Sequence, residues 1–176
     1  MHKYYSEIIY GGVDGLITTF AIIAGSLGGN LSKTVIIILG LASILADGFS
    51  MGISSYLAEK ARYKGQNALL VGLITFLSFI LIGIFPLIPF FFKFNNPFVI
   101  SSYILGFLLF ILGYMKGKIM DGVETFFIGG IAAIIAYYSA KTIANYEKKF
   151  NKKEDEDEDA GEDADETENM IEQISI

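Results

Sequence analysis

The sequence contains no cysteine, no tryptophan and a single histidine, His2. Without cysteine the chain can form no disulfide, no thiolate nucleophile and no zinc-finger-type site. One terminal histidine supplies neither a histidine cluster for a metal nor the base of a Ser/His/Asp hydrolytic set. These absences remove the common enzyme chemistries, and we expect neither enzymatic activity nor a resident cofactor.

Long apolar runs dominate what the sequence does contain. Of its 176 residues, 53% are hydrophobic and the mean hydropathy is +0.52, which is more apolar surface than one small water-soluble core can bury. The runs are of the ~20-residue length that crosses a bilayer, and they lack strict alternation, which favours helices over a β-barrel. We predict an all-α integral membrane protein with five transmembrane helices per protomer. The predicted spans are residues 8–28, 34–58, 68–92, 98–115 and 123–143.

Turn residues and prolines mark where spans end. Gly28, Gly29 and Asn30 suit a tight turn after the first span. Pro86 and Pro89 fall late in the third span and should kink or end it, because proline has no backbone N–H to donate.

The placement of lysine and arginine predicts the orientation of the chain. With five spans, the N-terminus shares a side with the loops after the second and fourth spans. That side carries six basic residues, whereas the other loops carry two. The positive-inside rule therefore favours a cytoplasmic N-terminus, although five lysines at the end of the fifth span and beyond argue the opposite way.

The net charge is divided unevenly along the chain. Residues 1–146 hold nine Lys or Arg and six Asp or Glu, a net charge of +3. Residues 147–176 hold four Lys and thirteen Asp or Glu, a net charge of −9, and few apolar residues, a composition that predicts disorder. We therefore divide the chain into a five-helix transmembrane domain, residues 1–146, and an acidic disordered C-terminal tail, residues 147–176. No basic patch suggests a nucleic acid partner.

Two aspartates, Asp14 and Asp47, fall inside predicted spans. A carboxylate at the bilayer centre costs at least ~2.5 kcal/mol, so it is rarely found there without a partner or a function. Glu7 lies seven residues before Asp14 and therefore on the same face of the helix, two turns away. Asp14 is either a hydrogen-bonded anchor of its helix or part of a binding site for a cation.

The second span carries a stripe of polar side chains. Ser43, Asp47, Met51, Ser55 and Glu59 recur every four residues and so follow one slowly drifting line along the helix. Oxygen ligands beside a thioether suit a first-row transition metal better than Mg²⁺ or Ca²⁺. A lone methionine in an apolar helix usually packs against its neighbours, so the case for Met51 as a ligand rests on Asp47 one turn away.

The polar residues lie in segments that resemble the vacuolar iron transporter family. The resemblance covers about residues 5–145, and its most specific motifs are those of the first two spans. The segments that carry it are residues 13–20 (VDGLITTF), 24–25 (AG), 46–52 (ADGFSMG), 56–57 (YL), 113–117 (GYMKG), 122–125 (GVET) and 128–133 (IGGIAA).

The resemblance implies a homodimer of five-helix protomers with cytosolic N-termini. It implies export of Fe²⁺, and often of Mn²⁺, from the cytosol in exchange for protons, across a vacuolar-type membrane or the plasma membrane. The family's path-lining aspartate matches Asp14, and its second-helix methionine matches Met51. We add Asp47, Glu7 and Glu59 as candidate metal-binding residues, because they share the helix faces of that pair.

The chain departs from the family pattern in two places. Ser43 stands where several members have an acidic residue, and Asp47, one turn later, is the candidate substitute. The connection at residues 59–66 is too short for the large acidic cytoplasmic insertion of the best-studied members. The chain therefore resembles the shorter members of the family, which lack that insertion.

The predicted function is a membrane transporter for divalent transition metals, with metal ions and membrane lipids as its partners. Two alternatives stay open. Gly11 with Gly15, and Gly25 with Gly29, have the spacing that lets helices approach closely, which also fits a non-transporting assembly subunit of a membrane complex. The other alternative is a membrane-embedded enzyme, which no catalytic set of residues supports.

Overall fold

The chain folds into a bundle of helices. The computed structural model describes residues 4–62, 67–92, 94–115 and 119–174, and no strand occurs among them. Five stretches are long and apolar enough to cross a membrane, and their bounds lie within a few residues of the predicted spans, which confirms the all-α prediction. The elements are α1 (Tyr5–Gly28), α2 (Lys33–Arg62), α3 (Ala68–Gly83), the 3₁₀ turn η2 (Phe85–Leu87), α4 (Ile88–Phe91), α5 (Pro97–Tyr114) and α6 (Ile119–Ile174).

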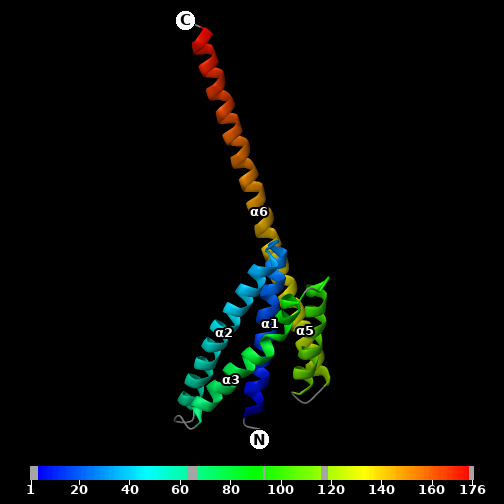
Figure 1. The fold of residues 1–176 in the computed structure, drawn as a ribbon. Coiled ribbons are helices and arrows are strands. Elements are labelled where there is room, and N and C mark those ends of the chain that lie inside the picture. Colours follow the sequence, from blue (N-terminus) through cyan, green and yellow to red (C-terminus); the bar gives the residue numbers. More distant parts are fainter. Residues whose placement is uncertain (1–3, 63–66, 93, 116–118, 175–176) are drawn as a thin grey trace.

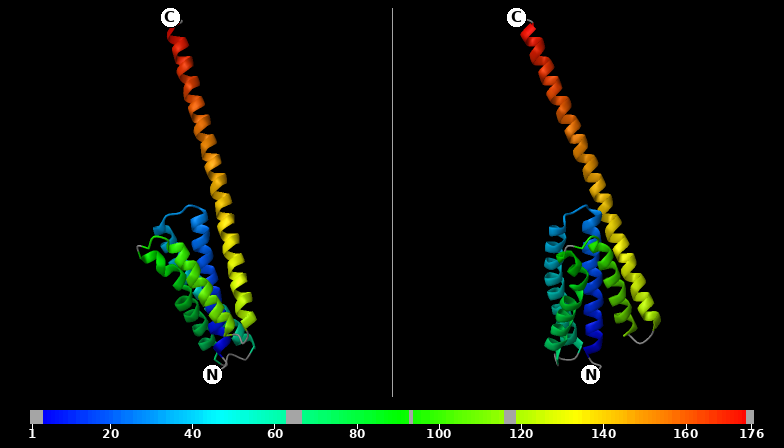
Figure 2. Two further views of the ribbon diagram at one scale, coloured as in Figure 1. Left: turned by 90° about the vertical axis from the view of Figure 1, so that its right-hand side faces the viewer. Right: turned by 45° about the vertical axis from the view of Figure 1, so that its right-hand side comes forward.

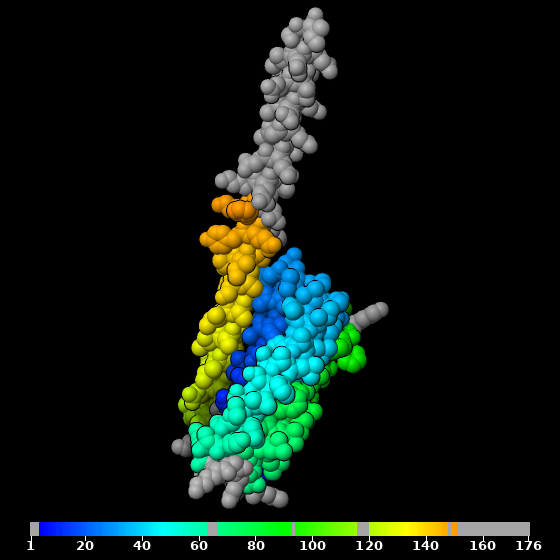
Figure 3. All heavy atoms as spheres, turned by 90° about the vertical axis from the view of Figure 1, so that its left-hand side faces the viewer, coloured from blue at the N-terminus to red at the C-terminus, as the bar shows by residue number. Residues whose placement is uncertain are grey.

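Helix α1 is the central element of the bundle. It contacts α2, α3, α5, α6 and η2 (Figure 1). Its apolar side chains belong to two buried clusters, one that joins Leu16 and Phe20 to Leu109 of α5 and one that joins Ile23 to Ile44 of α2. The space-filling view shows α2 and α3 side by side, with part of α1 visible between α2 and α6 (Figure 3). One side of α1 is therefore not covered by the rest of the protomer.

The turns occur where the sequence predicts them. Helix α1 ends at Gly28, and Asn30 adopts a left-handed conformation with φ of 60° before α2 begins. The third span is broken, since α3 ends at Gly83 and the turn that contains Pro86 precedes α4. The Ser101 hydroxyl of α5 donates a 2.6 Å hydrogen bond to the buried carbonyl oxygen of Pro86. This bond satisfies a backbone acceptor at the break in the span.

Two helix pairs approach to backbone contact at glycines. A Cβ atom placed on Gly15 of α1 would lie 2.5 Å from the carbonyl oxygen of Phe79 and 3.2 Å from the Cα of Gly83, both in α3. A Cβ atom placed on Gly52 of α2 would lie 3.0 Å from the carbonyl oxygen of Gly72, also in α3. Helix α3 thus holds α1 and α2 at close range, and these are the two helices that carry the predicted site.

Helix α6 leaves the bundle at the end opposite the N-terminus (Figure 1, Figure 2). Its membrane-spanning part is Met120–Glu147, and the helix continues to Ile174. The helical backbone differs from the disorder that the sequence predicted from residue 147. Residues 147–176 include eight Glu and four Lys, which are good helix formers, whereas repulsion between like charges four residues apart acts against a helix. The division of the chain into a domain and a disordered tail stays a prediction.

The close contact at Gly15 predicts a large stability difference between two glycine substitutions. Gly15→Ala should lower the free energy of unfolding by about 1–3 kcal/mol, because the new methyl group forces α1 away from α3. Gly130→Ala is the matched control, since nothing lies within 4 Å of its added Cβ, and alanine is the better helix former. Unfolding of both purified variants in detergent, followed by circular dichroism, measures the difference. Equal stabilities would contradict the contact.

Candidate functional site

The beginning of α1 and the end of α2 enclose an open cavity of about 460 Å³. Glu7 of α1 and Met51 and Glu59 of α2 lie on its wall, so three of the five predicted metal-binding residues share one cavity. The antiparallel course of the two helices brings these residues together, although they are far apart in sequence. The other residues on the wall are Ser6, Tyr10, Ser54, Ser55, Ala58, Arg62 and Val71.

Asp14 and Asp47 lie further along the same two helices and are not part of this wall. Both side chains are exposed on the protomer, and their carboxylates are close enough to interact electrostatically. The Ser43 hydroxyl donates a hydrogen bond to the Asp47 carboxylate. Two like charges near each other in a medium of low dielectric repel, and a proton or a divalent cation relieves that repulsion.

The helical rise places Asp14 and Met51 at a similar depth. Glu7 and Glu59 share the cavity, and from these two residues both helices run toward the middle of the bundle. At 1.5 Å per residue, Asp14 lies about 10 Å from Glu7 and Met51 lies about 12 Å from Glu59. A carboxylate and a thioether therefore occur at about one level, with the Asp47 carboxylate beyond them.

The polar stripe of α2 divides into two parts in the structure. Met51, Ser55 and Glu59 line the cavity, whereas Ser43 and Asp47 are joined to each other by a hydrogen bond. The four members other than Asp47 are partly buried. Only the Met51, Ser55 and Glu59 part of the stripe therefore lies on the cavity that α2 shares with α1.

The described residues of one protomer form no complete metal site of the usual kind. Within the described ranges, no three His, Cys, Asp or Glu side chains converge on one point. Resident transition-metal sites usually provide about four ligands in a fixed geometry. Pairs of carboxylates with one thioether bind more weakly, which suits an ion that must also leave.

Sequence reasoning missed two side chains on the cavity wall. Arg62 was used only to predict the orientation of the chain in the membrane. It lies three residues after Glu59, near the same helix face, and it lines the cavity. Tyr10 lies three residues after Glu7 in the same way. Both spacings are visible in the sequence, but neither indicates which helix the residue faces.

Five spanning helices define a multi-pass membrane protein, and comparison with known proteins identifies its family. Residues 5–68 and 62–141 match the VIT family, and the chain belongs to this family. The two matched segments meet at residues 62–68, where α2 connects to α3. This result confirms the resemblance found in the motifs of the first two spans.

Several relatives are known by name. A "Vacuolar iron transporter" of Toxoplasma gondii is 41% identical over 58 residues, which are 33% of this chain and 19% of that protein. One of Plasmodium falciparum is 42% identical over 55 residues, which are 31% of this chain and 20% of that protein. The chain thus spans about a fifth of the length of these two relatives. The "Vacuolar iron transporter 1" of Tulipa gesneriana is 24% identical over 212 residues and covers 78% of this chain and 86% of that protein. No solved structure matches the chain significantly.

The cavity predicts a difference in thiol reactivity between two faces of α2. Ser55→Cys places a thiol on the wall of the polar cavity, whereas Ile53→Cys places one on the outer, apolar surface of the same helix. A water-soluble maleimide should label Ser55→Cys at least about tenfold faster in proteoliposomes, because only the thiolate reacts and hydrocarbon disfavours that charge. The mass shift of the protein reports the rate, without background because the chain has no native cysteine. Equal rates would show that the cavity is not open to water.

Proposed function

We propose that the chain is a membrane transporter that moves divalent transition-metal ions, Fe²⁺ or Mn²⁺, out of the cytosol in exchange for protons. The observation that carries this proposal is the arrangement of α1 and α2. Glu7, Met51 and Glu59 share one cavity, and the carboxylates of Asp14 and Asp47 interact with each other beyond it. The relatives are named vacuolar iron transporters, which supports iron as the transported ion.

The proposed path begins at the open cavity. Glu7 and Glu59 attract the cation there, and Asp14 with Met51 binds it further along the helices, with the Asp47 carboxylate beside them. The combination of oxygen and thioether ligands favours Fe²⁺ or Mn²⁺ over Mg²⁺ and Ca²⁺, which select oxygen ligands alone.

Exchange with protons follows from the chemistry of the ligands. A carboxylate that binds a metal ion must first lose its proton, so metal binding releases protons. The repulsion between Asp14 and Asp47 is relieved either by protons or by one divalent cation. An acidic compartment on the far side then supplies the protons that displace the metal. The membrane is accordingly vacuolar-type or the plasma membrane, and the N-terminus is cytoplasmic.

A second copy of the chain completes the proposed site. Asp14 and Asp47 are exposed on the isolated protomer, and a carboxylate directed at hydrocarbon costs about 2.5–3.5 kcal/mol. A two-fold axis beside α1 and α2 would cover these side chains and double the number of ligands along the path. We therefore propose a homodimer.

The alternative of an assembly subunit has no specific observation in its favour. It relied on small residues of the first span as contact points for other proteins. In the structure, Gly11 and Gly15 lie against α3 and Gly25 lies against α6, whereas Gly29 contacts only residues of its own turn. These glycines therefore serve packing within the chain.

Flux measurements test the transport proposal and the site separately. Proteoliposomes with an acidic interior should take up Fe²⁺ and Mn²⁺, and little Ca²⁺, above the level of empty liposomes. Asp14→Asn and Met51→Ala should each lower the flux at least about tenfold. Loss of a residue that only hydrogen-bonds to a metal ligand already weakens metal binding ~10–100-fold, and loss of a ligand should cost at least as much. The matched control is Leu81→Ala, which removes a side chain from the outer surface of α3.

Two results would overturn different parts of this proposal. No flux for any of the ions, Zn²⁺ included, refutes transport. Flux that is unchanged in both Asp14→Asn and Met51→Ala refutes the assigned site while leaving transport in place.

The homodimer predicts the mass of the particle in a membrane. Native mass spectrometry of protein ejected from nanodiscs should show two copies of the 19.3 kDa chain. The physical reason is the cost of leaving Asp14 and Asp47 against lipid. A monomer that still transports metal would contradict the two-fold path.

A further inference from the structure

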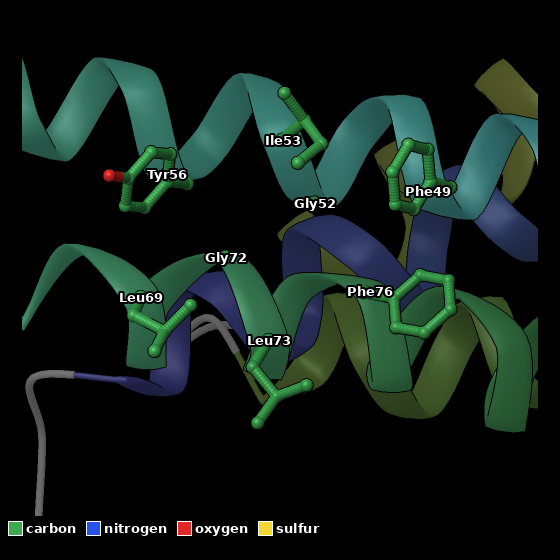
Figure 4. Close-up of a pocket in the computed structure, with 8 residues that line it drawn as sticks. All are labelled: Phe49, Gly52, Ile53, Tyr56, Leu69, Gly72, Leu73 and Phe76. Atoms are coloured by element: carbon green, nitrogen blue, oxygen red, sulfur yellow. The ribbon is translucent and has the colours of Figure 1, made fainter.

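Helix α2 has a second face, which is apolar. On this face α2 and α3 form an open groove of about 320 Å³ (Figure 4). The residues that line the groove are Phe49, Gly52, Ile53 and Tyr56 of α2 and Leu69, Gly72, Leu73 and Phe76 of α3. The groove shares no lining residue with the cavity that contains Met51 and Glu59, so it is a separate site.

The shape of the groove comes from the glycine contact described above. Gly52 and Gly72 bring the two backbones together and form the floor, because neither residue has a side chain to fill the space. Figure 4 shows Phe49 and Phe76 at one end and Tyr56 with Leu69 at the other. Leu69 is 76% exposed and Phe49 is 63% exposed, so the groove opens outward toward the region that the bilayer occupies.

The positively charged side chain of Lys60 lies at the Tyr56 end of the groove. The Lys60 ammonium lies 3.4 Å from the Tyr56 hydroxyl oxygen and 5.6 Å from the centre of its ring. An apolar channel with an ammonium and a hydroxyl at one end matches the chemistry of a lipid with an anionic head group.

We propose that this groove is a binding site for one anionic phospholipid. An acyl chain lies between α2 and α3 along the glycine floor, and a phosphate oxygen of the head group accepts hydrogen bonds from the Lys60 ammonium and the Tyr56 hydroxyl. Charge complementarity at the Lys60 end selects this occupant over a zwitterionic lipid. The proposal does not depend on the transported ion, because it uses a different face of α2.

A single tryptophan tests the site, because the chain has none of its own. Leu73→Trp places the reporter in the groove, and the full-length variant is reconstituted into phosphatidylcholine vesicles. Quenching by brominated phosphatidylglycerol is compared with quenching by brominated phosphatidylcholine at equal mole fraction. The expected preference for the anionic lipid is about fivefold, the ratio that one lysine near the membrane surface provides.

Three variants control the measurement. Lys60→Gln should reduce the preference to about one. Lys141→Gln should leave it unchanged, although Lys141 makes an equivalent contact with the Tyr137 ring at 5.7 Å. Phe107→Trp, on the outer surface of α5, should show no preference. Leu69→Trp is a second reporter in the groove if the first variant does not fold.

Several results would overturn the proposal. Equal quenching by the two lipids in the groove shows that the site has no charge selectivity. A preference that persists in Lys60→Gln removes the assigned head-group contact. Protection of the tryptophan from both lipids shows that protein, such as a second copy of the chain, covers the groove.

Discussion

The backbone contacts of α1 and α2 with α3 determine the geometry on which the rest of this protein depends. Moving an apolar side chain from lipid into a helix interface releases little free energy. Membrane helices therefore associate mainly by close packing of small residues. Gly15 against Phe79 and Gly83, and Gly52 against Gly72, provide that packing. As a result α1 and α2 lie beside each other, and their polar residues share a cavity instead of facing lipid separately.

The same packing gives α2 two faces with different chemistry. One face contributes Met51 and Glu59 to the polar cavity, and another forms the apolar groove over Gly52. An ion path and a lipid site can thus share a helix without sharing a residue. The exposed side chains of Asp14 and Asp47 link oligomeric state to function. The proposed ion must reach these two carboxylates, and the same carboxylates are costly to expose to lipid.

Particular residues show how far sequence reasoning reached. The five spans and the break near Pro86 were predictable, because hydropathy and the missing proline N–H act locally. Sequence reasoning named Glu7, Met51 and Glu59 as candidate metal-binding residues, and the structure places all three on the wall of one cavity. The position of Arg62 on the cavity wall was not predicted, because the sequence of one helix does not show which neighbouring helix a side chain faces. Whether these residues bind metal stays a prediction.

The sequence by itself determined the number of spans, the family and the stripes of polar residues along the first two helices. These properties follow from composition, motif and helical period, which act within one segment. Only the tertiary structure decided that Gly15 and Gly52 both pack on α3, that Asp14 lies near Asp47, and that a groove lies beside Lys60. The physical reason is register, because the level at which two antiparallel helices meet depends on side-chain packing between segments that are distant in the chain.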